Sequence, residues 1–273
     1  MQKIYFFIVS VLISLTCSAI EAIDSTFVIQ GAKGRLVTHL QLPAVKVSKI
    51  PVVIVCHGLT GNQNEKFLST IANNLLKRNM GVVRFDFNGH GQSEGELVDM
   101  NVLNEMQDLR NVVAWIEKQP FTKNLSLVGH SLGGIVVGMI APEMGKDGIK
   151  SLVLIASGGV APDLMLMGRL GQATFDPWNI PDYITIRPGK NIGGSYIETM
   201  RDLPIYQEAR KYTGPTYIIH GTHDQAVPYT YSQRYDEVMP NSQLELIDGE
   251  NHLLTLTNDA SADKIAQWLK NQQ

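Results

Sequence analysis

The sequence predicts an α/β domain whose sheet is mostly parallel and covered by helices on both faces. Apolar runs and segments of helical spacing alternate from Val52 to Lys270. Several of these runs are continuously apolar, which is typical of strands buried on both sides. The 273 residues are 44% hydrophobic and 18% charged, which is enough for one sizeable core. Such alternation favours parallel strands joined by crossover helices.

Composition narrows the function classes. A net charge of −3 argues against a surface that binds nucleic acid. The sequence has no internal repeat, no metal-ligand spacing and no glycine pattern that would hold a phosphate. The expected partner is a small-molecule substrate, with no cofactor and no metal, and nothing in the sequence indicates the oligomeric state.

The N-terminus has the plan of a signal peptide. Lys3 is followed by the apolar run Ile4–Leu15, and Cys17-Ser18-Ala19 places small residues before a cleavage site. The run is short for a membrane span, so we expect residues 1–22 to be removed and no stable span to remain. An uncleaved anchor and a lipid on Cys17 are the alternatives. The prediction is export, to a periplasm or out of the cell, of a domain over residues 23–273. Cys56 lies in an apolar strand, where a thiol is usually inert.

The first half of that domain divides into clear elements. An opening hairpin, a buried strand, a helix closed by Gly81, a second strand and an amphipathic helix ended by Pro120 are expected in this order. Their ranges are Thr26–Gln30 with Arg35–Leu42, Val52–Cys56, Phe67–Leu76, Val82–Phe87 and Val102–Ile116.

The most informative stretch follows. Leu125–Val128 reads as a buried strand, residues 129–133 read Gly-His-Ser-Leu-Gly, and Ile135–Ile140 begins an apolar helix. A serine on a strand–turn–helix junction, with glycines two residues to either side, is typical of a nucleophile elbow. Side chains at positions 129 and 133 would collide with the neighbouring backbone, so glycine is required there. The turn then exposes the Ser131 hydroxyl at the sheet edge.

The second half contains a long insertion. After a strand at Leu152–Ala156, roughly 60 residues pass before the next strand, far more than an ordinary connection. Because this stretch is aromatic and rich in proline, we expect a cap at about residues 160–204. The expected elements that follow are a helix Ile205–Tyr212, a strand Thr216–His220, a helix Tyr229–Met239, a strand Leu244–Ile247 and a helix Ala260–Lys270.

A serine nucleophile needs a base and a carboxylate, and both are present in the expected order. Asp224 follows the strand Thr216–His220, and His252 follows the strand Leu244–Ile247. We predict that His252 takes the Ser131 proton and that Asp224 fixes the tautomer of His252.

Other residues compete for these roles. His57, His130 and His220 are expected to be structural, and His223 could line the site. Asp248 is nearer to His252 in sequence but ends the same strand, so it would point poorly towards the imidazole.

The oxyanion of an acyl-transfer reaction needs backbone donors. The N–H groups of Leu59 and Leu132 are the predicted pair, one in the loop after the strand Val52–Cys56 and one just after the serine. Asp86 and the polar turn at residues 88–93 are expected to brace that turn through local hydrogen bonds.

With these residues in view, residues 25–273 resemble the α/β-hydrolase superfamily, and more narrowly the bacterial cinnamoyl and feruloyl esterases. The triad is common to the superfamily. The narrower resemblance depends on the stretches Arg84–Gly91, Leu203–Tyr206 and His220–Asp224, together with His57–Asn62 and Val102–Glu105. It implies an α/β-hydrolase fold with a mostly parallel central sheet, helices on both faces and a small cap after the sixth core strand.

In such esterases the cap holds the aromatic acyl group, and polar cap residues meet its phenolic hydroxyl. By position, the resemblance assigns this role to Asp163, Gln172 and Tyr196. One departure from the pattern is Leu132, where close relatives often carry glutamine, so the pocket wall here is expected to be more apolar.

Three functions follow as hypotheses. The first is an exported serine esterase that cleaves hydroxycinnamate esters, such as plant-wall phenolic esters, through an acyl-enzyme. The second keeps the chemistry but acts on acylglycerols or short-chain carboxylic esters, which the apolar Leu132, Leu164 and Leu166 favour. The third is a non-catalytic binding module, which the presence of the whole triad disfavours. Serine at position 131 argues against dehalogenases and epoxide hydrolases, whose nucleophile on this fold is aspartate.

Overall fold

The computed structural model describes residues 19–273. Most of the predicted signal peptide, residues 1–22, therefore lies outside the described residues. Contacts with the rest of the domain begin slightly before position 23, where the domain was predicted to start. Ile20 and Val45 form an antiparallel bridge with backbone hydrogen bonds of 2.8 and 2.9 Å. Among residues 19–273, no helix has both the length and the apolar character needed to cross a membrane.

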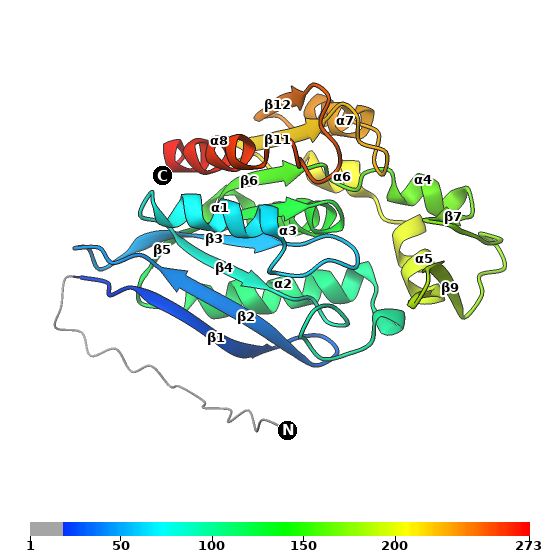
Figure 1. Cartoon of the computed structure of the whole chain (residues 1–273), viewed down its shortest axis with the longest axis horizontal. Coiled ribbons are helices and arrows are strands. Elements are labelled where there is room, and N and C mark those ends of the chain that lie inside the picture. Colours follow the sequence, from blue (N-terminus) through cyan, green and yellow to red (C-terminus); the bar gives the residue numbers. More distant parts are fainter. Residues whose placement is uncertain (1–18) are drawn as a thin grey trace.

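A single eight-stranded sheet organises the domain (Figure 1). Its strand order is β1-β2-β4-β3-β5-β6-β11-β12. The β1–β2 and β2–β4 pairs are antiparallel, and all other neighbours are parallel, so the predicted mostly parallel sheet is confirmed. The strands are β1 (Ile23–Gln30), β2 (Arg35–Leu42), β3 (Ile50–Cys56), β4 (Gly81–Phe85), β5 (Thr122–His130), β6 (Ile149–Ile155), β11 (Thr216–Gly221) and β12 (Ser242–Ile247).

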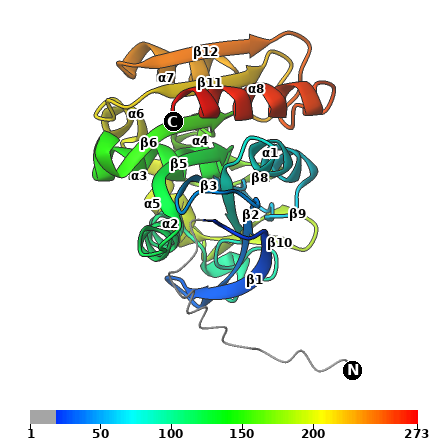
Figure 2. The same ribbon diagram turned by 90° about the vertical axis from the view of Figure 1, so that its left-hand side faces the viewer.

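Helices cover both faces of this sheet. Figure 2 shows α1 and α8 on one side and α2 and α3 on the other. The helices outside the insertion are α1 (Lys66–Leu76), the 3-10 turn η1 (Leu97–Asp99), α2 (Val102–Glu117), α3 (Leu132–Gly148), α7 (Thr230–Val238) and α8 (Asn258–Asn271). Each predicted core helix is present, with ends that differ by a few residues.

The core explains why the central strands are continuously apolar. In β3, Val52 and Ile54 pack in the cluster on the α2–α3 side, whereas Val53 and Val55 pack in the cluster on the α1–α8 side. All four side chains are fully buried. Because successive side chains point to opposite faces, a strand between two helical layers must be apolar at every position.

The insertion between β6 and β11 forms a small cap beyond the carboxyl ends of the parallel strands, at the right of Figure 1. It contains two short antiparallel hairpins. Its elements are α4 (Ala161–Leu166), β7 (Arg169–Leu170), β8 (Ala173–Thr174), β9 (Tyr183–Arg187), β10 (Lys190–Gly193) and α5 (Gly194–Arg201), and α6 (Ile205–Ala209) leads back to the sheet. The sequence predicted an insertion here but neither of its hairpins.

One local prediction was wrong. Gly81 does not close α1, because the helix ends at Leu76 and the left-handed residue that follows it is Asn79, with φ 60°. Gly81 instead begins β4, where a Cβ atom would lie 2.8 Å from the Leu42 side chain. Glycine is needed at this position for close packing within the sheet.

Candidate active site

Ser131 lies on a strained turn between β5 and α3. Its φ of 54° and ψ of −117° are unfavourable for a residue with a side chain. Backbone hydrogen bonds hold the turn in place: Ser131 N–H donates to Ile155 O, and Gly158 N–H donates to Ser131 O, both at 2.9 Å. The neighbouring β6 and the loop after it therefore stabilise the conformation that carries the serine.

The two glycines of the elbow are sterically required, as predicted. A Cβ atom on Gly129 would lie 2.3 Å from Gly133 O, and one on Gly133 would lie 2.4 Å from His57 O. Both contacts are with backbone, which cannot move aside cheaply. The helix after the serine thus packs directly against the end of β3.

Asp224 and His252 meet across the ends of β11 and β12. His252 Nδ1 lies 2.6 Å from Asp224 Oδ2, and the Asp224 side chain is completely buried. Asp224 Oδ1 accepts two backbone hydrogen bonds, from Ala226 at 2.8 Å and Val227 at 2.9 Å. Burial alone would raise the pKa of Asp224, but hydrogen bonds from His220 and His252 outweigh it and hold this pKa well below its usual value.

The elbow and the His252 loop are joined by His130. Its Nε2 lies 2.9 Å from His252 O, and the two imidazole rings are 4.8 Å apart. Burial lowers the pKa of His130 to about 4, so the ring is neutral and donates from Nε2. Within residues 19–273 no hydrogen bond joins Ser131 Oγ to His252. Without substrate, such contacts are often longer than in the reacting complex.

His220 is a part of the site that the sequence analysis regarded as packing. Its Nε2 lies 2.9 Å from Asp224 Oδ2 and 3.0 Å from Val227 O, and both of these atoms are acceptors. Nε2 must therefore carry the proton, and Nδ1 accepts from the Ser232 hydroxyl at 2.6 Å. The four-residue spacing of His220 and Asp224 was the sequence signal that could have revealed this contact.

The loop after β3 places the predicted oxyanion donors beside the serine. A Cβ atom on Gly58 would lie 2.9 Å from Ser131 Cβ. Leu59 N–H makes no hydrogen bond within the described part of the chain, and Leu132 is the first residue of α3, where helix N–H groups lack intrahelical acceptors. His57 stiffens the loop: its Nδ1–H donates to Gly58 O at 2.8 Å, and its Nε2 accepts from Phe87 N–H at 3.1 Å.

The cap touches this same loop. Arg187, at the end of β9, donates from Nη2 to Thr60 Oγ1 at 2.8 Å. Thr60 directly follows Leu59 and has a φ of 60°. A residue of the cap thus contacts the turn that carries one of the predicted oxyanion donors.

The polar turn after β4 is a brace, as predicted. Asp86 accepts from the backbone N–H of Gln63 at 2.7 Å and of Gln92 at 2.9 Å. Ser93 Oγ donates to Asp86 O at 2.5 Å. These contacts tie the turn to the loop after β3.

The three cap candidates lie in different surroundings, and no hydrogen bond within the described residues joins any two of them. Asp163 Oδ2 accepts from the Tyr231 hydroxyl at 2.7 Å. Gln172 is exposed in the turn between β7 and β8. Tyr196 is 2% exposed and lies near Glu105. Tyr231, from α7, is a polar neighbour that the sequence analysis missed.

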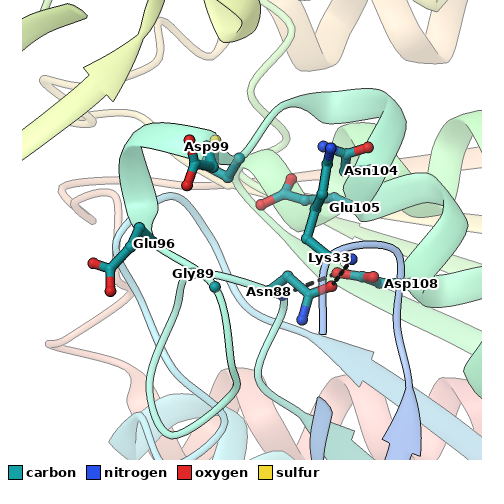
Figure 3. A pocket seen from close by; sticks show the side chains of 10 residues that line it. Lys33, Asn88, Gly89, Glu96, Asp99, Asn104, Glu105 and Asp108 are labelled. Atoms are coloured by element: carbon teal, nitrogen blue, oxygen red, sulfur yellow. Dashed lines mark hydrogen bonds between the residues drawn. The ribbon is translucent and has the colours of Figure 1, made fainter. Parts of the chain in front are cut away.

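A separate polar pocket lies under the turn between β4 and α2 (Figure 3). Its volume of about 10 Å³ suits roughly one water molecule. The Glu105 carboxyl points into it, is 1% exposed, and has no hydrogen-bond partner for either oxygen within the described residues. The pocket contains none of the residues that the sequence analysis assigned to catalysis.

The surroundings of Glu105 favour the protonated form of its carboxyl. Burial raises the pKa of its carboxyl well above the usual value, and the charge of Asp108 adds to this. His90 Nδ1 lies 3.9 Å away, but burial lowers the pKa of His90 to about 3, so it supplies no positive charge. His90 therefore does not offset the effect of burial on Glu105.

Glu105→Gln is expected to change how stability depends on pH. Because the folded-state pKa is raised, the native protein binds more protons than the unfolded chain from about pH 4.5 upwards, so this group costs stability as pH rises towards the folded-state pKa. Glutamine removes that loss. Urea unfolding from pH 4 to pH 8 should show that the free energy of unfolding of the variant rises relative to that of the wild type as the pH increases. Parallel stability curves would contradict a raised pKa of Glu105.

Comparison with known proteins agrees with this architecture. Residues 48–178 match the family described as "Serine aminopeptidase, S33", and residues 176–259 match the "alpha/beta hydrolase fold" family. Est1E from Butyrivibrio proteoclasticus, solved with ferulic acid bound, superposes with a TM-score of 0.86 at 28% identity. The match covers 90% of this chain and 98% of Est1E.

The curated relatives either match a shorter part of this chain or have a lower sequence identity to it. An Escherichia coli protein from the traX-finO intergenic region is 35% identical over 128 residues, which is 46% of this chain and 43% of the relative. The chain thus spans less than half the length of that relative. The rat mitochondrial palmitoyl-protein thioesterase ABHD10 is 23% identical over 83% of this chain and 81% of its own.

The sheet order, the helical layers and the elbow, together with these matches, define the class: the chain belongs to the α/β-hydrolase superfamily.

Proposed function

We propose that the protein is an exported serine esterase that hydrolyses hydroxycinnamate esters, with Ser131, His252 and Asp224 as its catalytic triad. The observation that carries the acyl preference is the likeness to Est1E, which binds ferulic acid and matches this chain over its cap as well as its core. Export is supported by the charged, apolar and small-residue plan of the N-terminus.

In the proposed reaction, Ser131 Oγ attacks the ester carbonyl carbon as His252 Nε2 takes the hydroxyl proton. Asp224 holds the proton on His252 Nδ1, which leaves Nε2 free to act as base. The oxyanion accepts hydrogen bonds from the Leu59 and Leu132 N–H groups. His252 then protonates the leaving alcohol, and an acyl-enzyme remains on Ser131. Water, deprotonated by His252, attacks this ester and releases the acid.

The cap supplies a partner for a phenolic hydroxyl in this proposal. Asp163 lies on α4, a few residues beyond Gly158, which is bonded to the nucleophile turn. Its carboxylate already accepts from the Tyr231 hydroxyl, so the pair offers both acceptor and donor capacity. Tyr196 and Gln172 are the further cap candidates.

Steady-state kinetics of the purified protein on one set of methyl esters tests the acyl preference. We expect kcat/KM for methyl ferulate to exceed that for methyl butyrate by at least about tenfold, and to exceed that for methyl 3,4-dimethoxycinnamate, which lacks the phenolic proton, by about tenfold. A preference for butyrate would overturn the hydroxycinnamate assignment.

A second candidate is an esterase for aliphatic acyl groups. Leu166 and Met167 of the cap are 47% and 67% exposed, and Leu132 at the elbow is apolar. The relative ABHD10 is named a palmitoyl-protein thioesterase. The same kinetics distinguish the two candidates, because an aliphatic preference reverses the ratio of ferulate to butyrate.

A further inference from the structure

Glu250 is a buried carboxylate that the proposed reaction does not use. It lies in the loop that joins β12 to α8 and carries His252 (Figure 1). The residue is fully buried. Its Oε2 accepts from Asn251 N–H at 3.0 Å, and its Oε1 accepts from Thr257 N–H. One carboxylate thus joins the two ends of the segment 251–257, which contains His252.

These two bonds favour a single conformation of the loop. Hydrogen bonds from backbone N–H groups to a carboxylate are charge-assisted, and losing one of them leaves a buried polar group unpaired. Thr257 directly precedes α8, so the carboxylate also lies at the positive end of the helix dipole. Because the ends of the segment are held together, fewer conformations are open to His252 between them.

The main chain of Glu250 connects this loop to the carboxylate of the triad. Its carbonyl oxygen accepts from His223 N–H at 2.8 Å, directly before Asp224. The approach is close, because a Cβ atom on Gly221 would lie 2.3 Å from the same oxygen. Residue 250 therefore links the loop that supplies Asp224 to the loop that supplies His252, and the two side chains meet at 2.6 Å.

The position of the His252 loop determines where the catalytic nitrogen lies. Asp224 holds Nδ1 of the imidazole, and His130 Nε2–H donates to the His252 carbonyl oxygen at 2.9 Å. In the proposed reaction Nε2 must reach the Ser131 proton first and the leaving oxygen afterwards. A misplacement of about 1 Å in such a group can cost about 10²-fold in rate.

We propose that Glu250 is a positioning residue of the reaction, whose carboxylate holds the His252 loop so that Nε2 reaches the leaving oxygen. The proposal rests on the triad proposed above. Because Glu250 is fully buried, it acts through His252, and the proton transfers stay with the triad.

Two esters of one acid test this role. A methyl ester needs a proton from His252 on its leaving oxygen, whereas p-nitrophenolate leaves without one. In Glu250→Gln an NH₂ group must face one of the two N–H donors. We expect kcat/KM for methyl ferulate to fall about 10²-fold and the ratio of methyl to p-nitrophenyl ferulate to fall about tenfold. A smaller folded fraction would lower both rates equally and leave the ratio unchanged.

Asn251→Ala is a second variant, which decides the question if Glu250→Gln does not fold. Asn251 is exposed, and its Oδ1 accepts from Leu253 N–H at 2.9 Å, so it braces the same loop across His252. We expect the ratio to fall here too, by a smaller factor. Asp259→Asn is the control: it removes an exposed carboxylate from the first turn of α8, leaves the loop closed and should not change the ratio.

Three outcomes overturn the proposal: an unchanged ratio in a folded loop variant, an equal loss on both esters, or the same fall in Asp259→Asn. His252→Ala separates this inference from the proposed reaction. If that variant keeps the wild-type rate, the triad is wrong. If it loses the rate and Glu250→Gln does not, only the role of Glu250 is wrong. The same ratio on butyrate esters serves an enzyme that prefers aliphatic acids.

Discussion

Ser131→Ala is expected to reduce kcat on any ester that the enzyme hydrolyses by about 10⁵–10⁶-fold. The substitution removes the atom that forms the acyl-enzyme, while the strained turn and the donors of Leu59 and Leu132 remain. His252→Ala should cost about as much, and the double variant little more than either, because the two residues act as a unit. Initial rates for the three variants, with circular dichroism to verify folding, check this expectation.

Labelling with a fluorophosphonate gives a second readout. Only an activated serine reacts with this probe, so wild type should be labelled and Ser131→Ala should not. Ser48→Ala, at an exposed loop position, serves as the matched control. It should be labelled like the wild type and should hydrolyse esters at the same initial rate. Labelling that persists in Ser131→Ala would place the nucleophile elsewhere and remove the basis of the proposed reaction.

Asp224→Asn is expected to lower kcat by about 10³–10⁴-fold with little change in fold. Asp224 Oδ1 accepts two backbone N–H groups, so the amide oxygen of asparagine must take that position. The amide NH₂ then faces His220 Nε2–H and His252 Nδ1. Two donors cannot face each other, so His252 must move its proton to Nε2, where it can no longer act as base.

Asp248→Asn is the matched control for this prediction. Asp248 is nearer to His252 in sequence, but its Oδ1 accepts from the Thr222 hydroxyl at 3.1 Å. The exchange should therefore change kcat less than about twofold. If instead Asp248→Asn is the slow variant and Asp224→Asn is not, the assignment of the carboxylate is wrong.

The core could be predicted from sequence because its signals are local. Continuous apolar runs such as Val52–Cys56 are typical of strands buried on both faces, and the amphipathic helices show their own period. The prediction for Gly81 was wrong because a glycine near a helix end can be required for either of two reasons, a left-handed backbone conformation or close packing. Only the neighbouring Leu42 distinguishes them. The cap hairpins are two to five residues per strand, too short to carry a pattern.

The site was predictable as far as chain order determines it. Ser131, Asp224 and His252 follow three different strands in the order that this architecture uses, and Asp224 and His252 meet at 2.6 Å. Side chains that contact the site from other helices could not be predicted in this way, because no motif or chain order indicates them. Ser232 reaches His220 from α7, and Tyr231 reaches Asp163 from the same helix.

The hydrogen bond from Arg187 to Thr60 has a consequence for protein engineering. Exchanging the cap for that of a relative is an obvious way to retarget such an enzyme. Here the exchange would also remove a hydrogen bond that supports the turn carrying Leu59, one of the predicted oxyanion donors. A chimaera whose new cap lacks an arginine opposite Thr60 should therefore lose turnover along with its old selectivity. One that keeps an arginine opposite the threonine should lose selectivity alone.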